Sequence, residues 1–171
     1  VSVMGFYIVL IAMVQFPIYE KPFNLILLVV LAAVAEIAAT FMAIDNDKIA
    51  FEVGTAIGLG AVPFYGPLAA CLIVMSSSLA FWVYKTYETS SAERNWMQLF
   101  FNIGMHSIAV FVAGTIFLII ESTDIAPVIR YTLAWLFAAI SYDQINFWLL
   151  AIMLRLRHGQ EFKPKVFWLE N

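Results

Sequence analysis

Long apolar runs separated by short polar stretches cover most of the chain. The runs extend for about 17–25 residues and do not alternate apolar with polar positions, as the strands of a membrane β-barrel would. Continuous runs of this length are typical of helices that cross a bilayer, because a helix satisfies its own backbone polar groups. The pattern predicts six helical segments, which are Val3–Ile18, Phe23–Ile44, Ile49–Phe64, Leu68–Tyr84, Trp96–Ile120 and Val128–Leu154.

The third predicted segment is short for a membrane-spanning helix. It has about 16 residues, or roughly 24 Å of helix, against a hydrocarbon core of about 30 Å. Gly54 and Gly58 form a small-xxx-small pair, which lets a neighbouring helix approach closely. We therefore expect a third segment that is short or re-entrant and that packs against its neighbour at these two glycines.

The composition indicates a membrane protein rather than a soluble domain. Hydrophobic residues make up 63% of the chain and charged residues 12%, whereas soluble domains contain about 25% charged residues. We expect an all-α polytopic membrane helix bundle over residues 1–154, in contact with the lipid of a bacterial cytoplasmic (inner) membrane. Residues 155–171 form a basic juxtamembrane segment, and the chain starts with Val1 rather than Met. We therefore expect a piece of a longer protein, with a cytoplasmic module after residue 171.

Lysine and arginine are unevenly divided between the two ends of the predicted helices. The loops on the cytoplasmic side of membrane proteins carry an excess of these residues. Seven of the nine fall on the side that holds both chain termini, so we expect both termini in the cytoplasm. The seven are Lys48, Lys85, Arg94, Arg155, Arg157, Lys163 and Lys165, and the opposite side holds Lys21 and Arg130.

Three titratable side chains fall inside the predicted spans: Glu36, His106 and Asp143. Such residues are costly in a bilayer and usually functional. Counted along its segment, each lies roughly 3–5 Å to the cytoplasmic side of the midplane. Asn102 lies one helical turn before His106, and Asn146 lies nearly one turn after Asp143. These five residues form a candidate ligand-binding cluster, in which His106 is the expected partner of a carboxyl group.

A purely structural interpretation of the same residues remains open. Polar side chains in membrane helices often bridge neighbouring helices, at about 0.6 kcal/mol on average. Three stripes that combine polar with small residues are expected to pack against protein rather than lipid. These stripes are Ala32, Glu36, Ala39, Thr40 and Ala43 in the second segment, Asn102, His106, Ala109 and Ala113 in the fifth, and Ala139, Asp143 and Asn146 in the sixth.

The sequence contains no catalytic motif that we can identify. It lacks a Gly-rich phosphate loop, a G-x-S-x-G motif and an H-E-x-x-H motif. Cys71 is the single cysteine, and the histidines do not supply zinc-ligand spacing around it. The net charge of −3 does not favour nucleic-acid binding. We therefore expect no enzyme, no metal and no nucleic acid, and the pattern indicates no particular cofactor.

Three stretches together resemble a known membrane domain: YGPLAACL at Tyr65–Leu72, LFFNIGMHSIAVFVAGTIF at Leu99–Phe117 and AAISYDQINFWLLAIMLRLRHG at Ala138–Gly159. Over roughly residues 23–171 the chain resembles the six-helix membrane sensor domain at the N-terminus of bacterial HD-GYP and GGDEF signalling proteins. That domain is similar in helix layout to the S-components of energy-coupling-factor vitamin transporters. The resemblance implies six helices, a cytoplasmic C-terminus and a cavity for a small ligand. It rests on Glu36, Gly66, Pro67, Phe101, Asn102 and Asn146.

Three classes of function remain open from the sequence. The favoured one is a membrane-embedded sensory or regulatory domain of a bacterial signalling protein, which binds a small ligand or senses the state of the membrane. The second is the substrate-binding subunit of a vitamin-type uptake transporter. The third is an accessory subunit of a respiratory or photosynthetic membrane complex, in which His106 would hold a pigment or haem. A fused or associated cytoplasmic output module is the partner expected for the first class.

Overall fold

The computed structural model describes residues 1–15, 22–42, 53–88 and 96–158 of the chain. Within these ranges every secondary-structure element is an α-helix, which confirms the expected all-α class. The elements are α1 (Ser2–Gln15), α2 (Pro22–Met42), α3 (Val53–Glu88), α4 (Trp96–Glu121) and α5 (Pro127–His158).

Four of these helices are long and apolar enough to cross a membrane, by length and composition. Their candidate spans are Pro22–Thr40, Val53–Tyr87, Trp96–Glu121 and Pro127–Arg155, whereas α1 contains the shorter apolar stretch Ser2–Ala12. Many large apolar side chains on these helices are exposed at the surface of the fold. Lipid is the solvent that such a surface fits, so the chain is a helical membrane protein.

The third and fourth predicted segments form one helical element, α3, with a sharp break at Gly66. Gly66 has φ 80° and ψ 173°, a conformation that is nearly restricted to glycine. Pro67 follows and suits the first position of a helix, because its missing N–H would have no partner there. The two arms of α3 on either side of Gly66 occupy the positions of the third and fourth predicted segments, and this single residue makes the turn between them.

The two arms of α3 fold back on each other. A Cβ atom added at Gly58 would lie 2.6 Å from Val74 Cγ2, and one added at Gly54 would clash with the side chain of Ser77. Gly54 and Gly58 of the first arm thus both touch the second arm directly. The first arm, residues 53–65, is only about 20 Å long, in keeping with the expected short segment.

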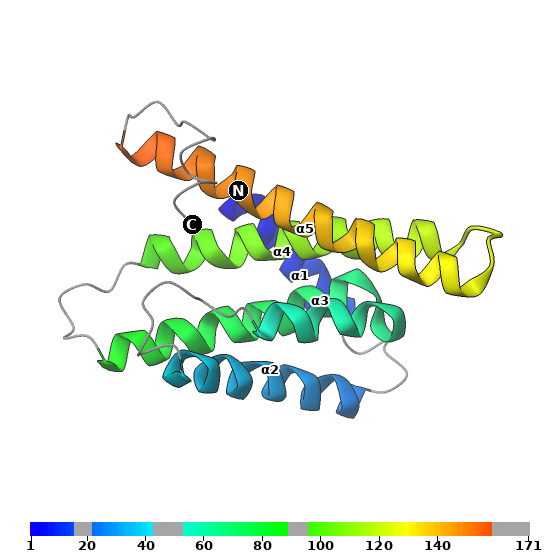
Figure 1. Cartoon of the computed structure of the whole chain (residues 1–171). Coiled ribbons are helices and arrows are strands. Elements are labelled where there is room, and N and C mark those ends of the chain that lie inside the picture. Colours follow the sequence, from blue (N-terminus) through cyan, green and yellow to red (C-terminus); the bar gives the residue numbers. More distant parts are fainter. Residues whose placement is uncertain (16–21, 43–52, 89–95, 159–171) are drawn as a thin grey trace.

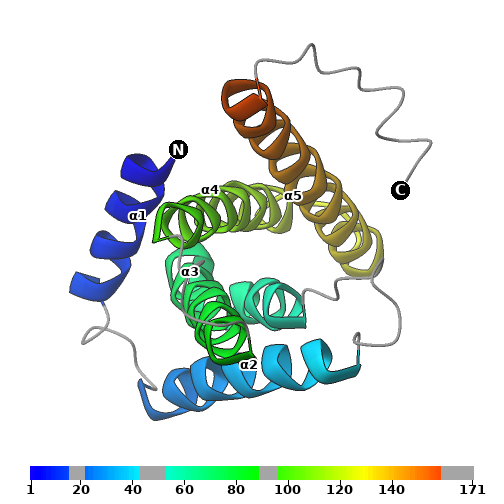
Figure 2. The same cartoon turned by 90° about the vertical axis from the view of Figure 1, so that its left-hand side faces the viewer.

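Helix α3 lies between α2 and α4, α1 packs on α4 and α3, and α5 packs mainly on α4 (Figure 2). Small residues permit the closest of these contacts. At the crossing of α1 and α4, a Cβ on Gly104 would lie 2.8 Å from Ser2 Cα, and one on Gly5 would clash with the backbone of Gly104. The main core cluster joins α1, α3, α4 and α5 and includes Val62, Val74, Val110, Phe117 and Ala138.

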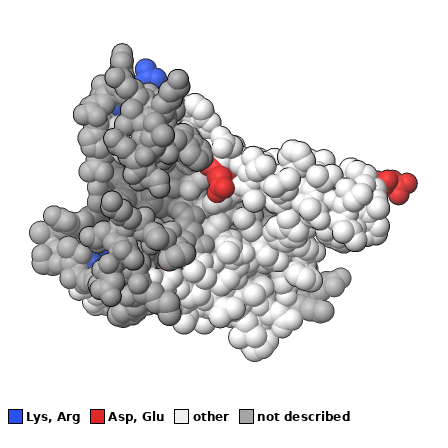
Figure 3. Space-filling model, in the orientation of Figure 1, with Lys and Arg blue, Asp and Glu red and all other residues white. Residues whose placement is uncertain are grey.

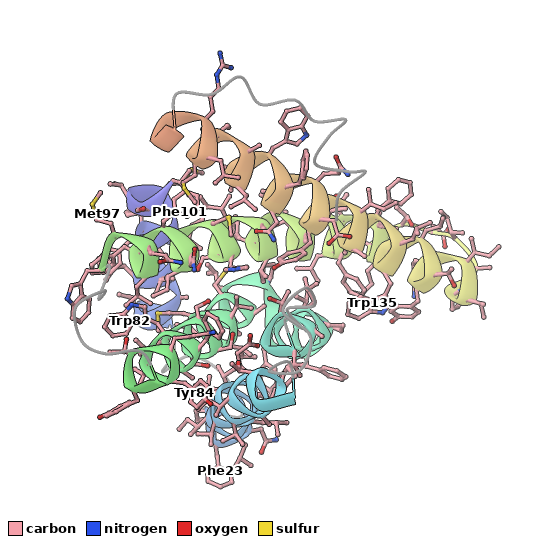
Figure 4. All side chains as sticks on the ribbon, turned by 60° about the vertical axis from the view of Figure 1, so that its left-hand side comes forward. Phe23, Trp82, Tyr84, Met97, Phe101 and Trp135 are labelled. Atoms are coloured by element: carbon pink, nitrogen blue, oxygen red, sulfur yellow. The ribbon has the colours of Figure 1, made fainter. Side chains whose placement is uncertain are left out.

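Helices α4 and α5 converge at the turn between them and separate toward the start of α4 (Figure 1). Near the turn, Phe117 and Trp135 contact each other with ring centroids 4.8 Å apart. At the opposite end, the ring centroids of Trp82 of α3 and Trp96 of α4 are 4.5 Å apart. Figure 4 shows Met97 and Phe101 on α4 at this same end. Figure 3 shows acidic atoms at the tip of the α4–α5 turn and few other charges on the described part of that face.

Candidate functional site

A buried tyrosine on α5 connects three helices. Tyr142 Oη lies 2.9 Å from His106 Nδ1 of α4 and 3.2 Å from Thr55 Oγ1 of α3. Both distances are within hydrogen-bond range. A phenol can donate to one partner while it accepts from the other. We call Thr55, His106 and Tyr142 the Tyr142 network, and it ties α5 to both α4 and α3.

Small residues bring α4 and α5 close enough for this contact. Two alanines follow the histidine on α4 and two precede the tyrosine on α5, each at a spacing that keeps them on one helical face. The two helices run in opposite directions from the turn that joins them (Figure 1), so these faces meet. The four fully buried alanines are Ala109, Ala113, Ala134 and Ala138.

Glu36 reaches from α2 to the start of α3. Its Oε2 atom accepts a hydrogen bond from the backbone N–H of Gly54 at 2.9 Å. Gly54 lies in the first turn of α3, where backbone N–H groups have no partner within the helix. A carboxyl group at this position also suits the helix dipole. Since Gly54 directly precedes Thr55, Glu36 lies one residue away from the Tyr142 network.

Two asparagines form a second polar level between α4 and α5. Asn102 precedes His106 by four residues and Asn146 follows Tyr142 by four, so the opposed helices bring them to one level. Both side chains are half-buried. The Asn146 Oδ1 atom is buried and has no hydrogen-bond partner in the described part of the protein. Such an atom is unfavourable when unpaired, and it offers an acceptor to a small donor molecule.

Asp143 departs from the expected cluster. Its side chain is exposed, as is that of Ala139, so the stripe predicted on this helix does not face protein along its length. The reason is the rotation of α5: the face with Ala134, Ala138 and Tyr142 turns toward α4, and one residue further along a helix points about 100° away. His106 therefore bonds the tyrosine next to Asp143 and not Asp143 itself.

The contacts of the site that the described part of the chain shows are hydrogen bonds. No group of three or more His, Cys, Asp or Glu that could hold a metal ion occurs there. The Cys71 thiol is buried and donates to the backbone carbonyl of Ser107 at 3.3 Å. The site thus places a carboxyl, an imidazole and a phenol across α2 to α5, and the amides of Asn102 and Asn146 lie about one helical turn from His106 and Tyr142.

Two members of the network, Thr55 and Tyr142, were not among the residues predicted from the sequence. The signal for Tyr142 was its position four and eight residues after Ala138 and Ala134, on one helical face that is small enough for close packing. The sequence pattern pointed less clearly to Thr55. Its position next to Gly54 becomes informative only when the helices that the first arm of α3 contacts are known.

Comparison with known protein families, with curated proteins and with solved structures found no match to this chain.

Proposed function

We propose that the chain is a membrane-embedded sensory or regulatory domain of a bacterial signalling protein, in which α5 carries the state of the domain to the cytoplasm. The observation that carries the proposal is the Tyr142 network. One buried hydroxyl on α5 holds side chains of both α3 and α4. A change at this hydroxyl alters the attachment of α5 to two helices at once.

Helix α5 is held mainly by one neighbour, which suits it to move. It packs mainly on α4, and the two helices separate toward the start of α4 (Figure 1). Hydrogen bonds between membrane helices contribute about 0.6 kcal/mol each on average. A ligand or a change of bilayer thickness that favours one arrangement by a similar amount would shift the population of α5 positions.

The proposal includes a topology with both termini in the cytoplasm. In this topology the chain has six segments, because the two arms of α3 count as separate segments and the first arm is a short one. The seven-to-two division of Lys and Arg supports it. In Figure 1 the start of α1, the start of α4 and the end of α5 lie toward one end of the bundle. Reporter fusions after residues 124 and 158 test it: periplasmic activity is expected at 124 and cytoplasmic activity at 158, and the reverse result contradicts it.

The ligand class supported by the site is a small molecule that donates hydrogen bonds. The unpaired, buried Asn146 Oδ1 atom is an acceptor beside the Tyr142 network. Occupying it would add a partner at the level where α4 and α5 separate. Sensing of bilayer thickness would act on the same contact, since a helix changes its tilt to match the hydrocarbon core.

The experiment that tests the proposal measures the distance between α4 and α5 in bilayers. Spin labels at Met97→Cys and Ile152→Cys report on it, because both residues are exposed and lie near the separated ends of the two helices. Double electron–electron resonance spectroscopy is carried out in nanodiscs of short-chain lipid and in nanodiscs of long-chain lipid. We expect different distance distributions in the two lipids. Identical distributions in both lipids, and no change with any hydrogen-bonding solute, would reject a sensory role. Accumulation of a solute by proteoliposomes would instead indicate transport.

A further inference from the structure

The outer face of α5 carries a polar pair that the rest of the fold does not use. Asp143 and Gln144 are both exposed, near the middle of the candidate span Pro127–Arg155. No hydrogen bond or ion pair of the Asp143 carboxyl is recorded within the described ranges of the chain. A carboxyl group facing lipid at this depth is strongly unfavourable. A partner for this carboxyl in a membrane would therefore lie outside the described residues.

The residues around this pair follow the spacing of a helix-pairing seam. Leu136, Ile140, Asp143 and Phe147 recur at intervals of four, three and four residues, which is the spacing of the contact positions in coiled coils. We call these four residues the outer α5 seam. It lies on the opposite side of α5 from Ala134, Ala138 and Tyr142, which face α4. A second helix can therefore occupy the seam without disturbing the Tyr142 network.

We propose that the outer α5 seam pairs with the same seam of a second copy of this chain, in parallel orientation. Two copies inserted the same way in a membrane are related by a two-fold axis along the bilayer normal, so each contact occurs twice. Asp143 supplies an acceptor and the Gln144 amide supplies donors. Each copy can therefore satisfy the carboxyl of the other, which an unrelated apolar helix cannot do.

A single polar position in an otherwise apolar seam also fixes the register of the pair. Any slip along the helices would set the carboxyl against leucine, isoleucine or phenylalanine and leave it unsatisfied. The seam thus specifies one dimer in which the two Asp143 residues lie at the same depth. This arrangement would bring the C-terminal ends of both α5 helices close together.

Cysteine cross-linking of the full chain in membranes tests the pairing. Ile140 and Trp148 are exposed to similar extents, 48% and 53%, but only Ile140 belongs to the seam. Under oxidation, Ile140→Cys is expected to form a covalent dimer and Trp148→Cys is not. The wild-type chain serves as the blank, because its single cysteine, Cys71, is buried. Equal cross-linking of both variants, or none, would overturn the proposal.

Substitution of the carboxyl tests the hydrogen bonds separately. Asp143→Leu removes two reciprocal bonds and is expected to raise the dimer dissociation constant roughly tenfold, measured by energy transfer between labelled copies in vesicles. Asp143→Asn retains an acceptor and is expected to change it less. Because the side chain is exposed, both variants should keep the fold. A monomeric wild-type chain, or an Asp143→Leu variant that pairs as well as the wild type, would contradict the inference.

Discussion

Replacing Tyr142 by phenylalanine isolates the contribution of the network that joins α3, α4 and α5. The change keeps the buried ring and its packing and removes only the hydroxyl, which lies 2.9 Å from His106 Nδ1 and 3.2 Å from Thr55 Oγ1. Two interhelical hydrogen bonds at about 0.6 kcal/mol each give roughly 1.2 kcal/mol. Because both bonds are made by a buried hydroxyl, the upper limit of the loss is about 3 kcal/mol.

The assay is reversible unfolding of the purified chain in mixed micelles, followed by circular dichroism. Tyr131→Phe on the same helix is the matched control, because Tyr131 is 41% exposed and the same atom is removed. We expect the free energy of unfolding to fall by about 1–3 kcal/mol in Tyr142→Phe and to stay nearly constant in the control. Equal stability of the two variants would refute the claim that the hydroxyl ties the helices together.

Substitutions at Gly66, Gly58 and Glu36, the last two with a control variant, test the α3 region by the same unfolding assay. Gly66→Ala forces a side chain into a glycine-only conformation (φ 80°) and should cost about 1–3 kcal/mol. Gly58→Leu should lower the free energy of unfolding by at least about 1–3 kcal/mol through overpacking. Gly60→Leu is the control and should not lower it, because no atom lies within 4 Å of a Cβ at that position. Equal losses in the two variants would argue against the folded-back arms. Glu36→Leu removes the hydrogen bond from the Gly54 N–H and should lower the free energy of unfolding by about 1–3 kcal/mol. Glu36→Gln keeps an acceptor and should lower it less. The same loss in both variants would exclude a capping role for Glu36.

The helices themselves were predictable because their apolar runs are long and uninterrupted. Bilayer-length hydrophobicity is a local property, so α2, α4 and α5 could be located from the sequence. The contacts of Gly54 and Gly58 followed the expected close approach, since only small residues let backbones come together. The sharpness of the break within α3 was not predictable, because one residue, Gly66, makes the entire turn.

The arrangement of the site was harder to predict, because it depends on the rotation of each helix about its axis. A rotation of about 100° separates neighbouring residues on a helix, and this difference exchanged Asp143 for Tyr142 as the partner of His106. The prediction favoured the carboxyl of Asp143 because it can carry a charge. In the structure, the buried side chain that contacts His106 is the phenol of Tyr142. Glu36 was found from the sequence, but its partner is a backbone N–H, which no side-chain pattern reveals.

The distance between α4 and α5 in the presence and absence of the Tyr142 hydroxyl shows whether the Tyr142 network holds α5 in place. Spin labels at Met97→Cys and Ile152→Cys are compared in one lipid, on the wild-type, Tyr142→Phe and Tyr131→Phe backgrounds. We expect a broader distribution with a longer mean distance for Tyr142→Phe, and no change for Tyr131→Phe. Superimposable distributions for all three chains would contradict this expectation, because α5 would then hold its position without the Tyr142 network.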